Sequence, residues 1–316
     1  MEYLILIISL FAIAFGADRF VDGSVAIARR LKISDFVIGA VVVGFGTSFP
    51  ELLVSLKGAV SGNSDVAIGN VVGSNIFNVL GILGVTAMLF PIATSKENIR
   101  RDAPFCFGVS ILLVLLAFDF FTKGETLISR IDGVLLLAVF VFFLWITLRK
   151  GNQNSSSETD VQPSNGKPLW YSVTVAIMGL SVLILGCHFF VEKAVVIARN
   201  FGVSDAYISI TLIACGTSLP ELAASVAAAL KKNTQMALGN VIGSNIFNIT
   251  LILGTSSLIR PLRSPDIVLT DYLVMTGAAL LLMIFATTKV RISRFEGLLM
   301  VLAFVAYNIW LISMQG

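Results

Sequence analysis

Residues 44–84, GFGTSFPELLVSLKGAVSGNSDVAIGNVVGSNIFNVLGILG, decide the fold of this chain, because the sequence contains them twice. The second copy, residues 214–254, reads ACGTSLPELAASVAAALKKNTQMALGNVIGSNIFNITLILG. At a constant shift of 170 residues, 22 of the 41 aligned positions are identical. A repeat of this kind predicts that the chain is built from two copies of one structural unit.

The composition around the repeat excludes a soluble globular protein. Of the 316 residues, 56% are hydrophobic and 13% are charged, and the mean hydropathy is +0.92. The apolar residues fall into blocks of about 20 to 25, which is the helix length that crosses a hydrocarbon core about 30 Å thick. We therefore predict an all-α membrane protein with ten spans, at about residues 3–28, 35–59, 66–90, 103–121, 130–149, 169–198, 205–230, 236–259, 267–287 and 295–313.

The charge and the cysteine content argue against a nucleic-acid partner, a disulfide framework and a thiol metal site. The net charge of +3 is small and its Lys and Arg residues are scattered, so we expect no nucleic-acid partner. Cys106, Cys187 and Cys215 are isolated in apolar stretches, whereas a disulfide framework or thiol metal site needs closely spaced cysteines. The bilayer is the expected environment, and neither a cofactor nor an obligatory protein partner is evident.

One polar segment, GNQNSSSETDVQPSNGKP at residues 151–168, divides the chain into two halves, residues 1–150 and 169–316. Its composition cannot bury apolar area, so we predict a flexible cytoplasmic linker. Each half contains five spans. Because five is odd, the second half must enter the membrane in the opposite direction to the first. This inverted repeat is typical of secondary transporters, whose binding site lies at the midplane where the copies meet.

The distribution of basic residues predicts the orientation. Fourteen of the 22 Lys and Arg residues lie on one side of the predicted spans. Cytoplasmic loops carry the excess of positive charge, so this side is expected to face the cytoplasm. We predict a multi-pass protein of the cell inner membrane with both termini outside the cytoplasm.

Two prolines predict interruptions in the repeated helices. Pro50 and Pro220 lie well inside their spans, and each would clash with the carbonyl four residues earlier, at Gly46 and Gly216. We expect both helices to break near the midplane. A break frees backbone carbonyls, which hydrocarbon does not tolerate unless they line a cavity or meet an ion.

Oxygen-bearing side chains surround these breaks. Glu51 and Glu221 directly follow the prolines, and Thr47 and Thr217 precede the glutamates by four residues, so each pair shares one helix face. On the next span, polar residues recur at every fourth position: Asn70, Ser74 and Asn78 in the first copy, and Asn240, Ser244 and Asn248 in the second. An all-oxygen set of this kind suits Ca²⁺, and Na⁺ by the same hard-ligand reasoning.

A structural interpretation of the glutamates is also possible. Ser48 with Glu51, and Ser218 with Glu221, match the capping-box pattern of a helix N-terminus. However, a glutamate near the bilayer centre costs about 2.5 to 3.5 kcal/mol on insertion scales, and this chain carries two. We therefore interpret both as ion ligands that can also cap their helices.

Other repeat residues are predicted to be structural. Asn75 and Asn245 lie off the polar stripes and are expected to make hydrogen bonds between helices. Gly69 with Gly73, and Gly239 with Gly243, form small-xxx-small patterns that allow close helix packing. Charged residues near span ends are expected to pair locally, with gating as the alternative role: Asp18, Arg19, Asp22 and Glu192.

The paired GTSFPEL and GTSLPEL segments, followed by GNVVGSNIFN and GNVIGSNIFN, resemble the two α-repeats of the cation/calcium exchanger superfamily, especially the prokaryotic sodium/calcium exchangers. The resemblance covers the ten-span layout and is most specific over residues 46–78 and 216–248. It implies overlapping sites for three Na⁺ ions or one Ca²⁺ ion. The implied ligands are the side chains of Thr47, Ser48, Glu51, Ser74, Asn78, Thr217, Ser218, Glu221, Ser244 and Asn248, with the backbone carbonyls of Gly44 and Ala214.

The sequence departs from the family pattern at one ligand position. Some members of the superfamily have Asp at a position matching Asn78 or Asn248, but this chain has Asn at both. The implied site then holds only two formal negative charges. The linker of about 18 residues is also too short for the calcium-sensing domains of animal exchangers.

The resemblance implies a transporter that uses Na⁺ entry to extrude Ca²⁺ by alternating access, and not an enzyme. On the same scaffold, the alternatives are an H⁺/Ca²⁺ exchanger and a K⁺-dependent Na⁺/Ca²⁺ exchanger. A passive cation channel would differ because its Ca²⁺ flux would need no counter-ion gradient. An intramembrane hydrolase would need a nucleophile with a base, or a pair of aspartates, in the membrane. The sequence shows neither at the midplane.

Overall fold

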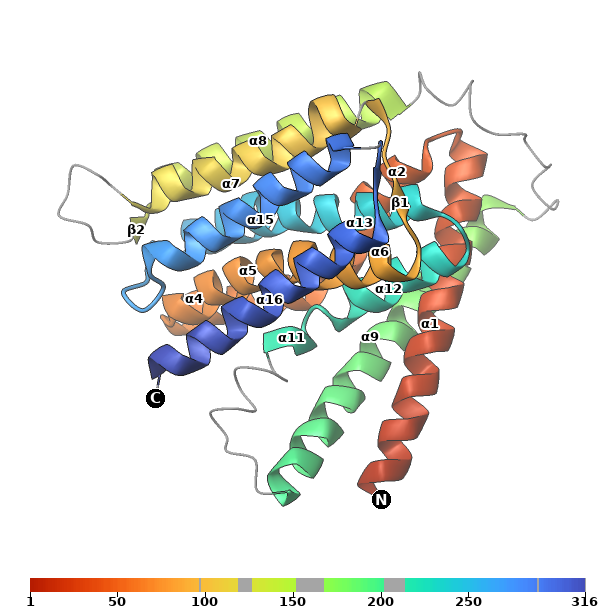
Figure 1. Ribbon diagram of the computed structural model, residues 1–316, viewed down its shortest axis with the longest axis horizontal. Coiled ribbons are helices and arrows are strands. Elements are labelled where there is room, and N and C mark those ends of the chain that lie inside the picture. Colours follow the sequence, from red (N-terminus) through yellow and green to blue (C-terminus); the bar gives the residue numbers. More distant parts are fainter. Residues whose placement is uncertain (97, 119–126, 152–167, 202–213, 289, 316) are drawn as a thin grey trace. The chain divides into compact units, whose positions relative to one another are not determined.

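The computed structural model describes the chain except for residues 97, 119–126, 152–167, 202–213, 289 and 316. Helices occupy all ten predicted spans, although much of the seventh lies outside the described residues (Figure 1). In the first half the elements are α1 Glu2–Leu31, α2 Asp35–Ile38, η1 Gly39–Val43, α3 Gly44–Thr47, α4 Phe49–Ser61, α5 Ser64–Ile76, η2 Phe77–Leu83, α6 Gly84–Leu89, β1 Ile92–Ala93, η3 Asn98–Asp102, α7 Ala103–Ala117, β2 Leu127–Ile128 and α8 Arg130–Gly151. In the second half they are α9 Leu169–Asn200, α11 Ala214–Gly216, α12 Leu219–Leu230, α13 Thr234–Phe247, η5 Asn248–Leu253, α14 Gly254–Ile259, β3 Leu262–Arg263, α15 Leu269–Thr288, β4 Arg291–Ile292 and α16 Arg294–Gln315.

Several helical segments are long enough to cross a bilayer. Within the described residues, seven are long and apolar enough to do so, and the bent pair Asp35–Thr47 and Phe49–Ser61 forms an eighth span. The helices of the fourth and seventh predicted spans are shorter. α7 has 15 residues and α12 has 12.

The sequence repeat has a counterpart in the secondary structure. The π-helices η2 and η5 occupy matching positions of the two copies, directly after α5 and α13. Two short antiparallel pairs link the copies crosswise, since β1 pairs with β4 and β2 pairs with β3. Ile92 lies opposite Ile292, and Leu127 lies opposite Arg263. Each pair therefore joins one strand of the first copy to one of the second.

The chain divides into two compact units that do not follow the two halves of the sequence. Unit 1 contains residues 1–50 and 144–240, and unit 2 contains residues 51–143 and 241–316. Each unit thus combines segments from both halves. The predicted linker at 151–168 lies almost entirely outside the described residues.

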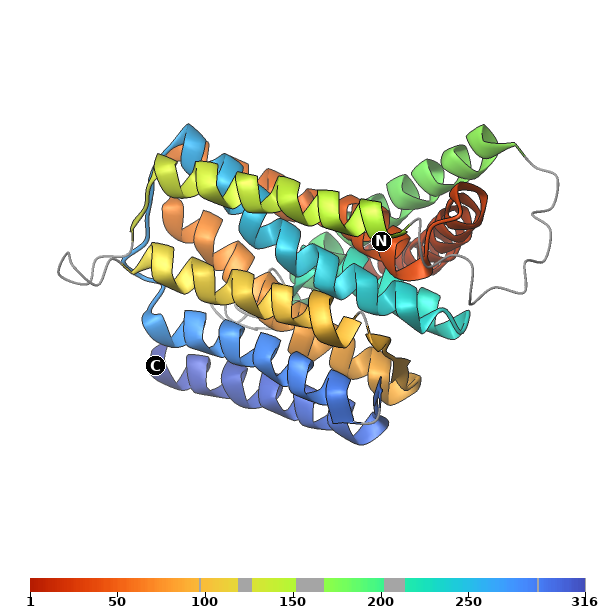
Figure 2. The ribbon, with the colours of Figure 1, turned by 90° about the horizontal axis from the view of Figure 1, so that it is seen from above.

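In unit 1, α1 and α9 pack closely along their lengths, and both also contact α12 (Figures 1 and 2). Glycines make this crossing possible. A Cβ atom added to Gly16 would lie 2.5 Å from the backbone nitrogen of Leu183, and one added to Gly179 would lie 2.9 Å from the Cα of Phe20. The two backbones are therefore as close as small residues allow.

In unit 2, α15 lies alongside α7 and α16 packs against α6 and η2 (Figures 1 and 2). Aromatic side chains fill the interior. The rings of Phe118 and Tyr272 meet edge to face at 5.1 Å, and those of Phe140 and Phe247 lie 5.4 Å apart. Such pairs add to the stability that apolar burial provides.

The predicted role of the repeat glycines in close helix packing is right for one residue and wrong for another. The close-packing role of Gly239 is confirmed, because a Cβ there would collide with the carbonyl oxygen of Phe36 and lie 2.9 Å from the nitrogen of Ala40. The same role is wrong for Gly73. That residue is exposed, and no described atom outside its own helix would lie within 4 Å of an added Cβ.

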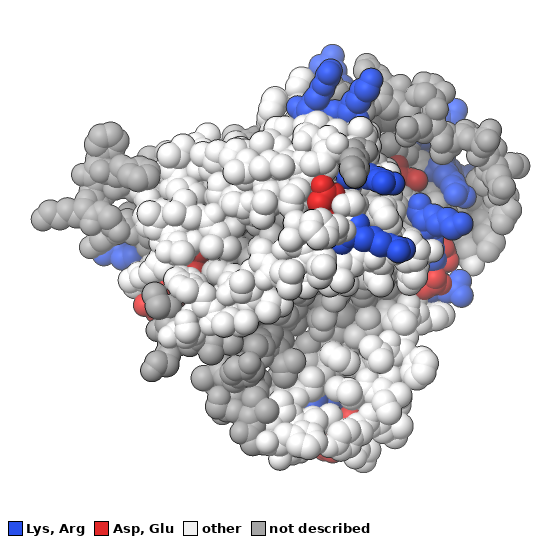
Figure 3. Space-filling view, in the orientation of Figure 1, with Lys and Arg blue, Asp and Glu red and all other residues white. Residues whose placement is uncertain are grey.

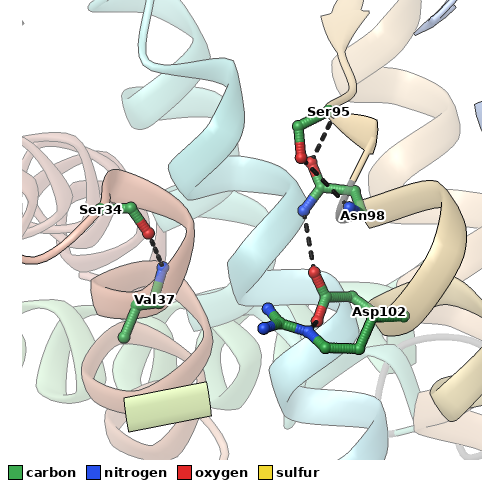
Figure 4. Close-up of polar contacts among 6 residues, drawn as sticks. Ser34, Val37, Ser95, Asn98 and Asp102 are labelled. Atoms are coloured by element: carbon green, nitrogen blue, oxygen red, sulfur yellow. Dashed lines mark hydrogen bonds and ion pairs between the residues drawn. The ribbon is translucent and has the colours of Figure 1, made fainter. Parts of the chain in front are cut away.

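Polar side chains make local hydrogen bonds near the first residues of a helix in each unit (Figure 4). In unit 1, Ser34 caps α2 by accepting a hydrogen bond from the backbone N–H of Val37 at 3.3 Å. In unit 2, Asn98 donates to the buried carboxylate of Asp102 at 3.1 Å, and Arg101 donates to it at 2.6 Å. Asp102 lies at the N-cap position of α7.

Much of the molecular surface is apolar. Large exposed side chains include Phe11 at 72%, Ile131 at 81% and Trp170 at 67% exposure. Most of the face seen in Figure 3 carries no Lys, Arg, Asp or Glu. A soluble protein would not tolerate so much exposed apolar area, whereas lipid-facing helices require it.

Candidate cation-binding site

Both predicted helix interruptions are confirmed. α3 ends at Thr47, α4 begins at Phe49, and the two segments are bent by 47°. In the second copy, α11 ends at Gly216 and α12 begins at Leu219. Pro50 and Pro220 lie in the first turn of the new helices, where a missing N–H costs no helical hydrogen bond.

The breaks place the two glutamates at helix N-termini inside the protein. Glu51 and Glu221 lie in the first turns of α4 and α12, and both are completely buried. The partial positive charge at a helix N-terminus favours a carboxylate at this position. Ser218 occupies the N-cap position of α12 but makes no side-chain capping bond, so the capping box does not explain this glutamate.

The backbone carbonyl at the first break is not released entirely. The carbonyl oxygen of Gly44 accepts a hydrogen bond from the backbone N–H of Ser48 at 3.1 Å. The same oxygen lies 3.4 Å from the Thr47 hydroxyl, which also donates to the carbonyl oxygen of Val43 at 3.0 Å. Its counterpart, Ala214, is the first residue of α11.

In unit 1, predicted ligands from the two sequence copies meet. The Ser48 hydroxyl donates to Oε1 of Glu221 at 2.9 Å. Thr47 Oγ1 lies 3.3 Å from Oδ1 of Asn240 and 3.0 Å from the carbonyl oxygen of Val43. Ser218 is also completely buried. The Ser48–Glu221 and Thr47–Asn240 contacts join residues that are more than 170 positions apart in the chain.

Each glutamate helix is braced by an asparagine on the helix that follows it. In unit 1, the Asn240 amide donates to the carbonyl oxygen of Glu221 at 3.2 Å and to the Ser225 hydroxyl at 2.9 Å. In unit 2, the Asn70 amide donates to the carbonyl oxygen of Glu51 at 3.1 Å and to the hydroxyl of Ser55 at 3.0 Å. The two arrangements repeat each other bond for bond.

This bracing gives Asn70 and Asn240 a structural role that helical spacing does not predict. The spacing places both among the oxygen-bearing residues, but in the structure their amide nitrogens hold the glutamate helices. Ser55 and Ser225 are not among the predicted site residues. Their spacing could have identified them, because each follows the glutamate of its copy by four residues and so shares its helix face.

Unit 2 holds the other predicted ligands. Glu51, Ser74, Asn78, Ser244 and Asn248 are all at most 2% exposed. Both asparagines lie within a π-helix or at its start, Asn78 in η2 and Asn248 in η5. π-Helical segments are rare and frequently occur at functional sites, because the wider turn changes the direction of the side chains. Nothing in the sequence pattern predicts these π-helical segments.

The predicted interhelical role of Asn75 and Asn245 is confirmed. The Asn75 amide nitrogen donates to the carbonyl oxygen of Asn245 at 3.2 Å, and the Asn245 amide nitrogen donates to the carbonyl oxygen of Asn75 at 3.3 Å. Their side-chain oxygens accept from the amides of two predicted ligands, Asn248 and Asn78 respectively, both at 3.0 Å.

Some buried oxygens of the predicted ligands have no hydrogen-bond partner among the described residues. Among them are Oε2 of Glu221, Oδ1 of Asn78 and Oδ1 of Asn248. A buried polar atom without a partner is costly, so such atoms call for an explanation. Carboxylate and amide oxygens are hard ligands that suit Na⁺ and Ca²⁺. The unsatisfied oxygens in each unit therefore have the chemistry of cation ligands.

Three of the charged residues near span ends, Asp18, Asp22 and Glu192, form ion pairs, as expected. Lys231 forms ion pairs with Asp18 at 2.7 Å and with Asp22 at 2.5 Å, which joins the end of α12 to α1 in unit 1. Lys193 forms one with its neighbour Glu192 at 2.6 Å. These pairs are partly exposed, and none includes a predicted ligand.

Comparison with known proteins identifies relatives along almost the whole chain. The family model described as sodium/calcium exchanger protein matches residues 1–149 and 171–313. The sodium/calcium exchanger MaX1 of Methanosarcina acetivorans is 34% identical, with 97% of each chain covered. The inner membrane protein YrbG of Escherichia coli is 35% identical, with 81% of this chain and 79% of YrbG covered.

The fold also matches solved structures. A structure of the sodium-calcium exchanger NCX_Mj soaked with zero Na⁺ and Ca²⁺ superposes with a TM-score of 0.84, 34% sequence identity and 98% of each chain covered. Another structure of that exchanger, soaked with 2.5 mM Na⁺ and 1 mM Sr²⁺, gives a TM-score of 0.83, with 35% identity and 97% coverage of each chain. The chain therefore belongs to the sodium/calcium exchanger family and is a multi-pass membrane antiporter built as an inverted repeat, not an enzyme.

Proposed function

We propose that this protein exchanges Na⁺ for Ca²⁺ across the cell inner membrane by alternating access. The observation that carries the proposal is the set of buried ligand oxygens without hydrogen-bond partners at Glu221, Asn78 and Asn248. A bound cation would satisfy buried oxygens of this kind. The relatives named sodium/calcium exchanger support the choice of ions.

We assign the cation ligands as the family resemblance implies. They are the side chains of Thr47, Ser48, Glu51, Ser74, Asn78, Thr217, Ser218, Glu221, Ser244 and Asn248, with the carbonyls of Gly44 and Ala214. The two glutamates supply the formal charge. Hydroxyls, amides and carbonyls complete the coordination without adding charge, so Na⁺ and Ca²⁺ compete for the same oxygens.

Alternating access needs a part that moves and a part that holds the ions. We assign the moving part to α1 and α9, because their glycine-lined crossing makes them a tight pair within unit 1. The excess of basic residues supports an orientation with Lys231 on the cytoplasmic side and both termini outside. The two copies would then expose the ions alternately to either side.

The test is uptake of ⁴⁵Ca²⁺ into proteoliposomes loaded with Na⁺, with K⁺, or with a pH gradient alone. We expect rapid uptake only with internal Na⁺. Uptake driven by the pH gradient would identify an H⁺/Ca²⁺ exchanger, and a requirement for K⁺ together with Na⁺ would identify a K⁺-dependent exchanger. Uptake without any counter-ion gradient would contradict antiport and indicate a channel.

The matched variant for this assay is Glu221→Gln. It keeps the size of the side chain but removes one of the two formal charges, and it leaves a divalent ion undercompensated in a low-dielectric site. We expect no exchange from a variant that still inserts and elutes as a folded protein. Substantial Na⁺-driven uptake by this variant would contradict the ligand assignment.

A further inference from the structure

We propose that Asn75 and Asn245 are positioning residues that hold the amides of Asn78 and Asn248 with their oxygens toward the cation. The inference rests on the proposed function, since it concerns how the same site presents its ligands. All four residues belong to unit 2 and are at most 3% exposed.

An asparagine amide can in principle point either way round, with its oxygen or its nitrogen toward a neighbour. In this structure, hydrogen bonds to backbone carbonyls fix the orientation of the Asn75 and Asn245 amides. Asn75 and Asn245 each donate from the side-chain nitrogen to the other's backbone carbonyl, at 3.2 and 3.3 Å. A backbone carbonyl can only accept, so neither amide can turn over without losing its bond.

The fixed amides of Asn75 and Asn245 then determine the orientation of the Asn78 and Asn248 amides. Oδ1 of Asn75 accepts from the amide nitrogen of Asn248, and Oδ1 of Asn245 accepts from that of Asn78, both at 3.0 Å. If either ligand amide turned over, its oxygen would face the oxygen that now accepts its bond. Both nitrogens are therefore held on the side of the positioning residues.

The ligand oxygens are consequently left on the other side. Oδ1 of Asn78 and Oδ1 of Asn248 are buried and have no hydrogen-bond partner among the described residues. An amide turned the other way would present N–H groups to a cation, which would repel it. Two neutral ligands thus depend on two neighbours that do not touch the ion.

The experiment compares Asn75→Ala with wild type in Na⁺-loaded proteoliposomes at a series of external Ca²⁺ concentrations. Without the acceptor at position 75, the Asn248 amide can turn over. Interhelical side-chain hydrogen bonds in membranes correspond to equilibrium factors of about 3 to 20. We expect the half-saturating Ca²⁺ concentration to rise by about that factor, with a smaller change in the rate at saturating Ca²⁺.

A suitable control is Thr250→Val. Thr250 is fully buried in η5, and its hydroxyl donates only within its own helix, to the carbonyl of Ile246 at 2.6 Å. This change should leave the half-saturating concentration unaltered. A rise equal to that of Asn75→Ala would mean that the effect comes from a general disturbance of the helix.

The decisive comparison repeats Asn75→Ala in an Asn248→Asp background. A carboxylate presents an oxygen on either side, so its orientation does not depend on Asn75, and the oxygen that faces Oδ1 of Asn75 is repelled by it. In this background we expect Asn75→Ala to cause no rise in the half-saturating Ca²⁺ concentration, because removing Oδ1 only relieves that repulsion. An effect of the same size in both backgrounds would show that Asn75 has only a packing role and would overturn the inference.

Asn245→Ala, with Asn78→Asp as its background, tests the other half of the arrangement and serves if Asn75→Ala does not fold. If neither variant folds, isotope-edited infrared spectroscopy of wild type with ¹³C-labelled asparagine side chains tests whether their carbonyl oxygens meet the cation. Ca²⁺ must shift the side-chain carbonyl band, and an unshifted band refutes the inference. Wild type that transports no Ca²⁺ in exchange for Na⁺ would instead contradict the proposed function, so the two failures are distinguishable.

Discussion

Replacing Asn240 with Ala should weaken the fold by loosening the helix that carries Glu221. Asn240 is 1% exposed, and its amide donates to the Glu221 carbonyl at 3.2 Å and to the Ser225 hydroxyl at 2.9 Å. Its oxygen also lies 3.3 Å from the Thr47 hydroxyl. Alanine removes all three contacts and leaves buried acceptors unsatisfied.

The expected magnitude follows from these contacts. Side-chain hydrogen bonds between membrane helices contribute about 0.6 kcal/mol on average and up to about 1.7 kcal/mol each. Loss of the two donated bonds, with the small cavity left behind, should therefore lower the free energy of unfolding by about 2 to 3 kcal/mol. Ser225→Ala removes only one of the bonds and should cost about half as much.

Reversible unfolding by SDS in mixed micelles, followed by circular dichroism, measures these differences. Asn308→Ala is the matched control, because the Asn308 amide donates only to the carbonyl of Phe304 in its own helix, at 2.8 Å. The double variant Asn240→Ala/Ser225→Ala should have the same stability as Asn240→Ala to within about 0.5 kcal/mol, because both substitutions remove the same hydrogen bond. Asn240→Ala within about 0.5 kcal/mol of wild type would refute this reasoning.

Three further predictions concern packing, charge and topology. Gly179→Ala should destabilise the protein by about 1 to 3 kcal/mol, because the new methyl group meets the backbone of α1. The control Gly108→Ala should not, because its methyl group meets no described atom outside its own helix within 4 Å. Equal thermal stability of the two variants would contradict the packing argument. Lys231→Met should change stability by less than about 1 kcal/mol in the same SDS assay, because its ion pairs with Asp18 and Asp22 are partly exposed; a larger loss would show that they are structurally essential. Cysteines replacing Ser61 and Lys232, in a background without native thiols, should react with an impermeant reagent from outside and from inside respectively, and labelling of both from one side would refute the proposed orientation.

The sequence alone determined the membrane class, the ten-span plan and the repeat. These features depend on local quantities, namely the length of apolar blocks, the position of prolines and the identity of residues 170 positions apart. The helix breaks at Pro50 and Pro220 were predictable for the same reason, because a proline acts on its own turn of helix. The two glutamates were recognisable because a charge in an apolar span is expensive.

Only the tertiary structure decided which groups meet. Helical spacing shows which residues share a face, but it does not say that Ser48 donates to Glu221, 173 positions away. Nor does it show that Asn240 supports a glutamate helix through its nitrogen, or that Gly73 faces open space. The π-helices at Asn78 and Asn248 also depend on packing between segments. The direction of each buried amide is set by partners brought from the other repeat, and those partners are known only once the chain has folded.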